Sequence, residues 1–374
     1  MIRVGITGQS GFIGTHLFNY LSIKNNKFKL IPFYDDFFSD EKKLRDFCSN
    51  CDVIIHLAAL NRHNNPTEIY NTNLILVEKL IFSLNQLKSK AHIIFASSIQ
   101  EERENEYGRS KREGRLKLAQ WAKNNKSGFT GLIIPNVYGP FGRPFYNSVI
   151  STFSYQLCNN ETPKIEIDLE LKLIYVGELV QLIEKIISEN INSFQDFYIV
   201  PHTYLINVTG ILDKLKKYQS LYLNSGILPE LNNPFDINLF NTFRSYINLE
   251  KFFPYRYKLN ADSRGIFVEI IKLYSGGQVS FSTTLPGITR GNHFHTRKIE
   301  RFAVIKGEAV IRLRKFRTAK VSEFKLSGTE PAFIDMPIWY THNITNIGNS
   351  ELVTIFWINE FFNPDDPDTF SETV

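Results

Sequence analysis

The sequence predicts an α/β protein in which a doubly wound parallel sheet is followed by an all-β barrel. Three observations lead to this fold class. Strand-like apolar runs alternate with amphipathic helical stretches through the first half of the chain, and a glycine-rich turn follows the first run. After Phe253-Pro254 the helical spacing disappears, and short strands follow one another, separated by Gly, Pro and Asn. A chain of 374 residues also exceeds the usual size of one hydrophobic core, so we expect two domains.

The first domain is expected to span residues 1–250 and the second residues 251–374. Strands of the first domain are predicted at 3–7, 29–34, 53–58, 92–97, 130–134 and 197–200, with helices at 13–23, 73–87 and 107–123. Residues 207–251 have helical spacing without strands, and we interpret them as closing helices and a connector. Strands of the second domain are predicted at 265–271, 277–283, 299–305, 308–314, 332–335 and 352–358.

The composition is that of an ordinary globular protein, with 43% hydrophobic and 22% charged residues. The net charge of +5 is spread along the chain, which argues against nucleic acid as a partner and mildly favours an anionic substrate such as a sugar diphosphate. Three cysteines are too few for a disulfide framework and indicate a reducing compartment. No signal-peptide pattern and no long apolar run is present, so we expect a cytoplasmic protein without a membrane partner.

Glycines recur at every third position between the first strand and the first helix. Gly8, Gly11 and Gly14 allow a tight turn and a close approach to a pyrophosphate, which the amides of Phe12 and Ile13 at the helix N-terminus would bind. The strand–turn–helix context predicts a Rossmann-type dinucleotide site.

An acidic pair, Asp35 and Asp36, lies where the second strand is expected to end. A carboxylate at this point would accept a hydrogen bond from the ribose 2′-hydroxyl and repel a 2′-phosphate, so Asp35 favours NAD. Two adjacent aspartates are also common in solvated turns, and the choice between NAD and NADP stays open.

Tyr107 and Lys111 are four residues apart on a predicted helix and therefore share one face. A neighbouring ammonium is expected to lower the pKa of the phenol towards the working range of an acid–base catalyst. Upstream, Ser97-Ser98 ends a predicted strand with a hydroxyl that can orient a carbonyl oxygen. The order of these groups after the glycine turn predicts a carbonyl oxidoreductase site.

These motifs resemble the extended short-chain dehydrogenase/reductase family, in the branch that modifies nucleotide sugars. The resemblance implies that Tyr107 gives a proton to the substrate carbonyl, that Lys111 also binds the nicotinamide ribose, and that Ser98 rather than Ser97 polarises the substrate oxygen. It further implies cofactor contacts in two other segments, from Leu57 and Ala58 and from Pro135 and Asn136.

Substrate contacts are predicted after the fifth strand. Asn136 would lie beside the nicotinamide and the sugar, and Arg143 and Asn147 are candidates for contacts with the diphosphate or hexose. Arg143 and Asn147 can equally well fix their own loop. Asn73 matches a recurrent asparagine of the family, and a hydrogen bond at a helix start explains it equally well.

The second domain contains two histidine motifs. His293 and His295 are two residues apart, so they face one side of a strand, and Glu300 follows in G-x5-H-x-H-x4-E-x6-G; His342 lies in P-x4-H-x3-N. Both motifs resemble those of the cupin family, which implies a barrel in which these four residues bind a divalent metal. Zn, Fe, Mn and Ni all suit such ligands, and zinc is the expected ion. A metal-free epimerase with a histidine base is the alternative.

One residue departs from the cupin pattern. Trp339 stands where the second motif usually has glycine, so we expect a reshaped cavity mouth.

Both domains in this order resemble the bifunctional enzymes of capsular polysaccharide synthesis over essentially the whole chain, including segments 97–100, 146–150, 286–293 and 364–369. The resemblance implies a UDP-linked substrate, UDP-2-acetamido-2,6-dideoxy-hexos-4-ulose. The barrel would epimerise C3, and the first domain would then reduce C4 with NADPH, or with NADH if Asp35 decides, on the route to UDP-N-acetyl-L-fucosamine. A homodimer through the helices at 73–87 and 107–123 is expected.

Two alternatives differ from this interpretation. The first domain can be a redox-neutral 4-epimerase or dehydratase that retains NAD, although Ile99-Gln100 replaces the acidic pair that dehydratases usually have. The barrel can be a dimerisation or sugar-binding module without chemistry of its own.

Overall fold

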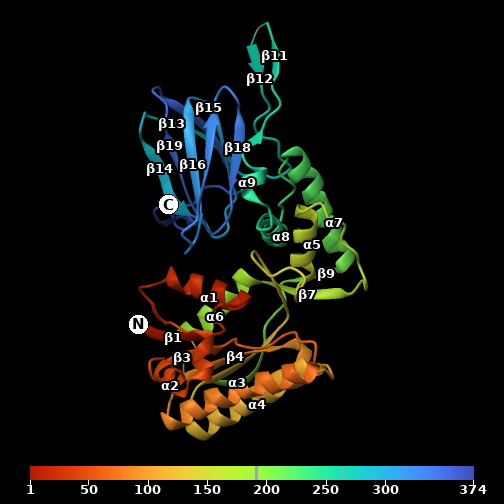
Figure 1. The fold of residues 1–374 in the computed structure, drawn as a ribbon, viewed down its shortest axis with the longest axis vertical. Helices are drawn as coiled ribbons and strands as arrows, with labels where there is room; N and C mark the ends of the chain where they lie inside the picture. Colours follow the sequence, from red (N-terminus) through yellow and green to blue (C-terminus); the bar gives the residue numbers. More distant parts are fainter. Residues whose placement is uncertain (190–192, 264) are drawn as a thin grey trace. The chain divides into compact units, whose positions relative to one another are not determined.

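The computed structural model describes residues 1–189, 193–263 and 265–374, and the chain forms two compact units (Figure 1). The first unit comprises Met1–Val149 and Asp168–Val208, and the second comprises Ile150–Ile167 and Thr209–Val374. The boundary expected near residue 250 lies inside the second unit. Among the described residues, no helix combines the length and the apolar character that a membrane crossing requires.

A six-stranded parallel sheet with the order β2-β1-β3-β4-β5-β8 forms the centre of the first unit. Its strands are β1 (Ile2–Thr7), β2 (Phe28–Ile31), β3 (Val53–His56), β4 (His92–Ser98), β5 (Phe129–Ile134) and β8 (Phe194–Ile199). Because β2 and β3 lie on opposite sides of β1, the winding direction reverses there, and the carboxyl ends of β1 and β3 open a crevice for a ligand. The predicted doubly wound sheet is confirmed.

Helices cover both faces of this sheet (Figure 1). One face carries α1 (Phe12–Ser22) and α6 (Val176–Glu189), and the other carries α2 (Glu41–Ser49), α3 (Pro66–Gln86) and α4 (Glu106–Asn125). Helix α3 begins seven residues before its predicted start, because Asn65 caps the amide of Thr67 and Pro66 suits the first helical position. Under α3 and α4, Leu80, Ile93 and Leu118 are fully buried in the core.

Shorter elements complete the first unit. They are a three-stranded sheet of β6 (Asn136–Tyr138), β7 (Glu170–Tyr175) and β9 (Tyr204–Asn207), with the 3₁₀ helices η1 (Asp35–Ser39) and η2 (Ile99–Glu102). Helix η2 directly follows β4, so it separates the predicted Ser98 from the start of α4.

The second unit contains a barrel of two antiparallel five-stranded sheets, with the orders β10-β18-β15-β20-β13 and β17-β16-β19-β14-β21. The strands are β10 (Tyr255–Arg256), β13 (Gln278–Thr284), β14 (Thr289–Phe294), β15 (Glu300–Lys306), β16 (Glu308–Lys315), β17 (Val321–Ser327), β18 (Ala332–Met336), β19 (Tyr340–Asn346), β20 (Leu352–Ile358) and β21 (Phe370–Ser371). Ile311, Phe333 and Ile334 are buried between the sheets. The predicted all-β barrel is confirmed.

The same unit also contains helices. They are α5 (Val149–Cys158), α7 (Val208–Tyr218), the π helix η3 (Gln219–Leu223), α8 (Pro234–Arg244) and α9 (Leu249–Phe252). Of these, η3, α8 and α9 contact the barrel. The buried Tyr222 hydroxyl donates to Asp335 on β18 at 2.7 Å, and Arg301 on β15 binds the same carboxylate through two hydrogen bonds. This buried network joins η3 to strands β15 and β18, so residues 209–250 belong to the same compact unit as the barrel.

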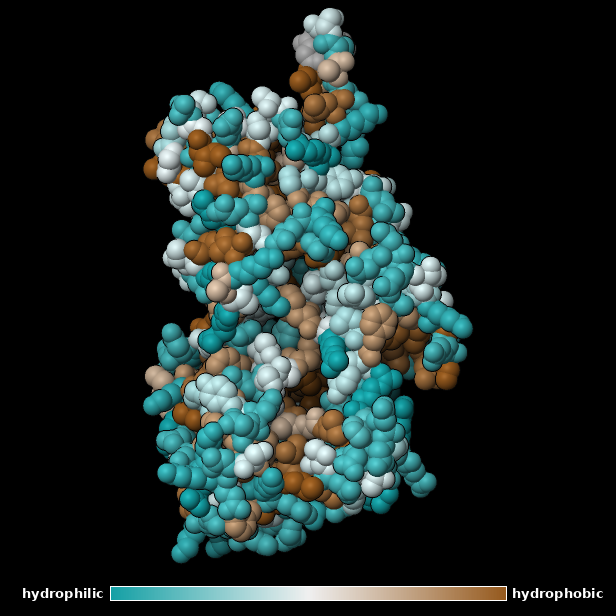
Figure 2. All heavy atoms as spheres, viewed as in Figure 1, coloured by the Kyte–Doolittle hydropathy of each residue, from teal (hydrophilic) through white to brown (hydrophobic). Residues whose placement is uncertain are grey.

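A two-stranded hairpin of β11 (Asn260–Asp262) and β12 (Gly265–Phe267) extends from the barrel (Figure 1). Ile266 and Phe267 are exposed on it, and Figure 2 shows apolar atoms on the hairpin amid a largely hydrophilic surface. Exposed large apolar side chains of this kind mark a surface that a binding partner can cover.

Candidate active site and metal centre

The glycine turn after β1 has a backbone that larger residues would disrupt. Gly8 has φ +69°, and a Cβ atom on it would lie 2.8 Å from the Ala58 amide nitrogen. A Cβ atom on Gly14 would lie 2.2 Å from the Gly8 carbonyl oxygen. Gly11 donates its amide to the same oxygen at 3.0 Å and caps α1 without a side chain, so the first amides of the helix, from Phe12 and Ile13, face a ligand position.

The surroundings of this turn fit a dinucleotide. The Gln9 side-chain oxygen is buried without a hydrogen-bond partner among the described residues. Ser10 in the turn donates to Asp35 at 3.1 Å, which places that carboxylate beside the glycines, whereas Asp36 forms an ion pair with Lys43 at 2.7 Å. The amide of Ala58 donates to the Thr7 hydroxyl at 3.3 Å.

These contacts separate the roles of the two aspartates. Asp35 contacts the glycine turn through Ser10, and Asp36 belongs to a surface ion pair. Leu57 lies beside the same turn, because its amide donates to the Thr7 carbonyl at 3.2 Å.

Three elements place the predicted catalytic groups. Ser98 ends β4, and its hydroxyl accepts a hydrogen bond from the Gln100 amide at 3.2 Å. Tyr107 and Lys111 lie one turn apart near the start of α4. A Cβ atom on Gly108 would lie 2.0 Å from the Gln100 carbonyl oxygen, so glycine alone lets α4 begin directly against η2. The predicted shared face is present, with the Lys111 ammonium 5.8 Å from the centre of the Tyr107 ring.

Burial controls the protonation of this pair. It lowers the pKa of Lys111 to about 8, against the opposing attraction of Glu101, and the ammonium donates to the Ala96 carbonyl at 2.9 Å. Burial, with a smaller contribution from Tyr146, raises the pKa of Tyr107 to about 12. The direction expected for the phenol pKa is therefore wrong for the protein alone, because desolvation is the main influence on it. Tyr107 is a protonated phenol at neutral pH, which is the form a proton donor needs.

Activity should depend on the Lys111 ammonium. Below pH 8 the Lys111 side chain is a charged ammonium, and above pH 8 it loses its proton and its charge. Above pH 8, kcat/KM for the reduced cofactor should therefore fall up to about tenfold per pH unit. In Lys111→Arg this decline should disappear up to pH 10, even if the overall rate is lower, because a guanidinium stays charged. Profiles measured between pH 6 and 10 test this, and a flat profile for the natural enzyme contradicts it.

The loop after β6 contributes a residue that the sequence did not single out. Tyr146 lies close enough to Tyr107 to influence its pKa, and the Arg143 guanidinium stacks over the Tyr146 ring at 5.3 Å. Arg62 donates to the Phe145 and Tyr146 carbonyl oxygens at 3.1 and 2.9 Å and fixes this loop. An aromatic residue between two polar candidates was the only available signal.

The remaining residues predicted to contact cofactor or substrate lie in and after the β5–β6 connection. Arg143 and Asn147 are exposed. Pro135 is buried between β5 and β6, and Asn136 is exposed while its amide donates to the Lys172 carbonyl at 3.2 Å.

Asn73 joins two parts of the active site. Its side chain accepts from the Leu60 amide at 2.7 Å and donates to the Ser110 hydroxyl on α4 at 2.9 Å. Because α3 begins at Pro66, Asn73 lies inside the helix, and the helix-start explanation is wrong. The residue holds the loop after β3 against the catalytic helix.

All four predicted metal ligands converge in the barrel. His293 on β14 pairs in register with His342 on β19, Glu300 begins β15 of the other sheet, and His295 follows the end of β14. One ligand atom from each residue lies within 4.8 Å of the others. The Glu300 carboxylate is 3.0 Å from His295 Nε2 and 3.3 Å from His342 Nε2.

The electrostatics of this cluster fit a cation. Glu300 Oε2 and the Nε2 atoms of His295 and His342 are buried and make no well-formed hydrogen bond within the described chain. Burial would raise the pKa of Glu300, but its interactions with His295 and His342 hold that pKa well below its usual range. Burial, reinforced by the other two imidazoles, lowers the pKa of His293 to about 4. A carboxylate beside a neutral imidazole is a suitable set of donors for a divalent metal.

Trp339 adopts the backbone conformation for which the cupin pattern uses glycine. Its φ is +61°, and its amide donates to the His295 carbonyl at 2.7 Å. The buried ring stacks on Phe294 with 5.6 Å between centroids. Since Phe294 lies between the two histidines, its side chain points to the opposite side of the strand. The ring thus packs against the residue between the two histidines, and the reshaped cavity mouth stays a prediction.

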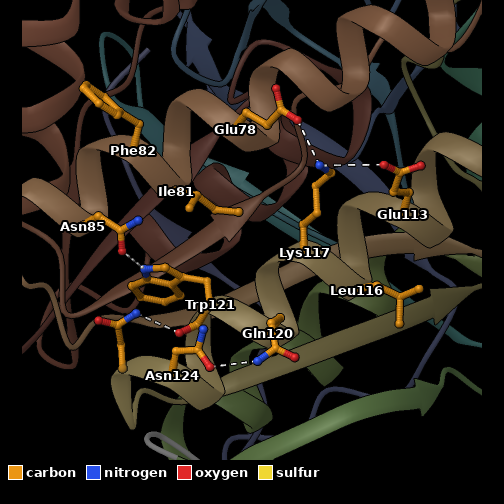
Figure 3. Close-up of a pocket in the computed structure, with 11 residues that line it drawn as sticks. Glu78, Ile81, Phe82, Asn85, Glu113, Leu116, Lys117, Gln120, Trp121 and Asn124 are labelled. Carbon is orange, nitrogen blue, oxygen red and sulfur yellow. Dashed lines mark hydrogen bonds and ion pairs between the residues drawn. The ribbon is translucent and has the colours of Figure 1, made fainter.

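A separate groove lies on the outer surface of α3 and α4 (Figure 3). Lys117 bridges Glu78 at 3.0 Å and Glu113 at 3.7 Å, and the Trp121 indole donates to Asn85 at 2.9 Å. None of the predicted catalytic or cofactor residues lines it, so this groove is distinct from the active site.

The chain belongs to the NAD dependent epimerase/dehydratase family, whose model matches residues 4–199. A second family model, the polysaccharide biosynthesis C-terminal domain, matches residues 260–370. The fold and the Tyr107–Lys111 pair therefore define an NAD(P)-dependent enzyme of the oxidoreductase and epimerase type with a fused barrel.

Two relatives match this chain over its whole length. The UDP-2-acetamido-2,6-beta-L-arabino-hexul-4-ose reductase of Pseudomonas aeruginosa is 30% identical over 378 residues, which cover 100% of this chain and 99% of the relative. The crystal structure of the capsular polysaccharide assembling protein CapF from Staphylococcus aureus matches with 33% identity, a TM-score of 0.64 and complete coverage of both chains. The resemblance to the bifunctional capsular polysaccharide enzymes is confirmed.

The UDP-glucose 4-epimerase of Thermotoga maritima shares the fold alone. It is 19% identical with a TM-score of 0.52, over 59% of this chain and 83% of that one.

Proposed function

We propose that the first unit reduces the C4 ketone of UDP-2-acetamido-2,6-dideoxy-hexos-4-ulose with NADPH or NADH, after the barrel has epimerised C3. The product would be a precursor of capsular polysaccharide on the route to UDP-N-acetyl-L-fucosamine. The observation that carries this proposal is the half-buried Tyr107 phenol beside the buried Lys111 ammonium, on the first turns of α4. The whole-length similarity to the Pseudomonas reductase supports the choice of substrate.

The residues of the first unit divide the reduction between them. A bound nicotinamide supplies hydride to the carbonyl carbon. Ser98 would donate a hydrogen bond to the carbonyl oxygen, and Tyr107 would give its proton to that oxygen as negative charge develops on it. The Lys111 ammonium then faces the new phenolate and stabilises it. Arg143, Asn136 and Asn147 would hold the sugar diphosphate.

The proposed chemistry of the barrel is proton exchange at the carbon next to the ketone. We propose that His293, His295, Glu300 and His342 bind one divalent metal, with zinc as the expected ion. The ion supplies positive charge that favours an enolate, which is worth several kcal/mol. Reduction of C4 then removes the carbonyl and fixes the new configuration at C3.

The reductase proposal is tested by incubating the UDP-4-keto sugar with NADH and NADPH while following cofactor absorbance. Consumption of either cofactor is expected, and consumption of neither, with NAD retained through purification, would establish the redox-neutral alternative. For the barrel, solvent deuterium should enter C3. Replacing His295 with Ala should abolish this exchange while cofactor oxidation persists on substrate already epimerised; retained exchange would leave the barrel a binding or dimerisation module.

The cofactor preference should depend on Asp35. Its carboxylate faces the glycine turn and would repel a 2′-phosphate, so Asp35→Asn should raise kcat/KM for NADPH relative to NADH by about tenfold. Asp36→Asn is the matched control, because Asp36 is paired with Lys43 and should leave the ratio unchanged. An equal response of both variants would contradict the assignment.

We propose a homodimer through the outer faces of α3 and α4, the groove of Figure 3. Phe82 and Leu116 are 49% and 46% exposed there, as expected for side chains that a second copy covers. The double variant Phe82→Glu with Leu116→Glu should be monomeric by light scattering, whereas Leu205→Glu, an exposed residue on β9, should stay dimeric. A monomeric natural protein, or a dimeric double variant, would refute this interface.

A further inference from the structure

The C-terminal segment, residues 364–374, contains a short strand that pairs with β14, the strand that carries His293. Within it, β21 pairs with β14, so that Ser371 lies opposite His293 and Phe370 opposite Phe294. The Phe370 ring stacks on Phe294 with 5.2 Å between centroids, and the Glu372 amide donates to the Asn292 carbonyl at 3.0 Å. The end of the chain is therefore an additional edge strand directly beside two of the four candidate ligands.

Asp368 in this segment contacts His295, one of the four candidate ligands, directly. Its carbonyl oxygen accepts a hydrogen bond from His295 Nδ1 at 2.5 Å. A donor at Nδ1 places the lone pair of that imidazole on Nε2, the atom that lies 3.0 Å from Glu300. The Asp368 carbonyl thus fixes both the orientation of the ring and the tautomer that a metal requires.

The Asp368 carboxylate organises the loop between His295 and Glu300. It accepts hydrogen bonds from the amides of Thr296, Arg297 and Lys298 at 3.0, 3.0 and 2.9 Å, and from the Thr296 hydroxyl at 2.6 Å. Asn359 binds the one remaining amide of this loop, that of Ile299, at 2.8 Å. Only four residues separate the two ligands, so the carboxylate sets the spacing between them.

The local geometry shows that this position is specialised. Asp368 is 4% exposed, and its φ is +41°, a left-handed conformation that a residue other than glycine adopts only where its surroundings require it. A buried carboxylate with four hydrogen bonds to one loop is a strong fixed contact, because each bond is charge-assisted.

We infer that Asp368 is a positioning residue of the metal centre, acting through His295 and through the loop that leads to Glu300. This inference rests on the proposed metal site and adds the end of the chain to it. Outer contacts of this kind commonly account for a 10–100-fold difference in metal affinity. The carboxylate would act without touching the ion, by holding two of its ligands at the correct separation.

The test is the affinity of the full-length protein for Zn²⁺, measured by competition with a chromophoric chelator after metal removal. Asp368→Ala should bind Zn²⁺ about 10–100-fold more weakly than the natural protein. Asp365→Ala removes an exposed carboxylate from the same segment and should bind within about twofold of it. The d–d bands of the Co²⁺-loaded proteins, at roughly 500–700 nm, report the ligand geometry. They should differ from those of the natural protein in Asp368→Ala but not in Asp365→Ala.

A purely structural role gives a different result. It would lower the melting temperature of the metal-free protein while leaving the Zn²⁺ affinity of the folded fraction unchanged, and that outcome overturns the inference. If Asp368→Ala does not fold, the Zn²⁺ affinity of Asp368→Asn is measured instead. Asparagine tolerates the left-handed backbone, but its side chain cannot replace a carboxylate that accepts four hydrogen bonds. The Zn²⁺ affinity of this variant should therefore fall by at least about threefold. Unchanged affinity in Asp368→Asn also overturns the inference. If the natural protein binds no Zn²⁺, the metal centre itself is wrong, and the inference is lost with it.

Discussion

Tyr107→Phe should lower kcat/KM for ketone reduction by about 10²–10⁴-fold, the usual contribution of a positioned general acid. The substitution removes one oxygen from a half-buried ring at the start of α4 and keeps the rest of the ring. Cofactor binding, measured by fluorescence titration, should stay within about twofold, because the glycine turn is untouched. Deuterium incorporation at C3 should continue, since the barrel has its own candidate site.

Tyr70→Phe is the matched control for this variant. Tyr70 lies on α3, and its hydroxyl donates to Glu113 on α4 at 2.5 Å. This hydroxyl takes no part in the proposed reaction. The reductase activity of Tyr70→Phe should be nearly natural. An equal loss in both variants would mean that the hydroxyl of Tyr107 has no chemical role.

Gly14→Ala should weaken binding of the reduced cofactor by about 10–100-fold, which corresponds to the 1–3 kcal/mol of an overpacked site. The new Cβ atom would lie 2.2 Å from the Gly8 carbonyl oxygen, a backbone atom that can move only if the turn opens. Opening the turn displaces the amides at the start of α1 that would bind the pyrophosphate.

Gly11→Ala is a graded control in the same turn. Its Cβ atom would lie 3.2 Å from the same oxygen, so a small shift accommodates it, and the loss of affinity should be smaller. Isothermal titration of both variants with the cofactor measures the difference. If Gly11→Ala were the more damaged of the two, the steric account of this turn would be incorrect.

The sequence predicted the central sheet well because parallel strands are buried on both faces. Val53–His56 and the apolar part of His92–Ser98 are continuous apolar runs, which periodicity identifies easily. Apolar patterning did not predict strand β19, and β14 was placed on a strand only through its histidine motif. Their sequences, Thr289–Phe294 and Tyr340–Asn346, are rich in polar residues because they carry the histidines of the candidate site. The motifs located these histidines where hydrophobic patterning could not.

Contacts between distant segments were beyond the sequence. Arg62 holds the loop that carries Tyr146 across 84 positions of the chain, and Asp368 meets His295 across 73 positions. The pKa of Tyr107 was predicted in the wrong direction for a similar reason. Spacing revealed the nearby lysine, but the extent of burial, which dominates the pKa, depends on the complete fold.

We propose that the first unit transfers hydride to a sugar ketone while Tyr107 supplies the proton. Reduction of the UDP-4-keto sugar with a nicotinamide cofactor that carries deuterium at the transferred position tests both parts of this proposal. One deuterium should appear at C4 of the product for each cofactor oxidised, and almost no labelled product should form from Tyr107→Phe over the same time. A labelled cofactor recovered unchanged beside a converted sugar, or a fully active Tyr107→Phe, would contradict it.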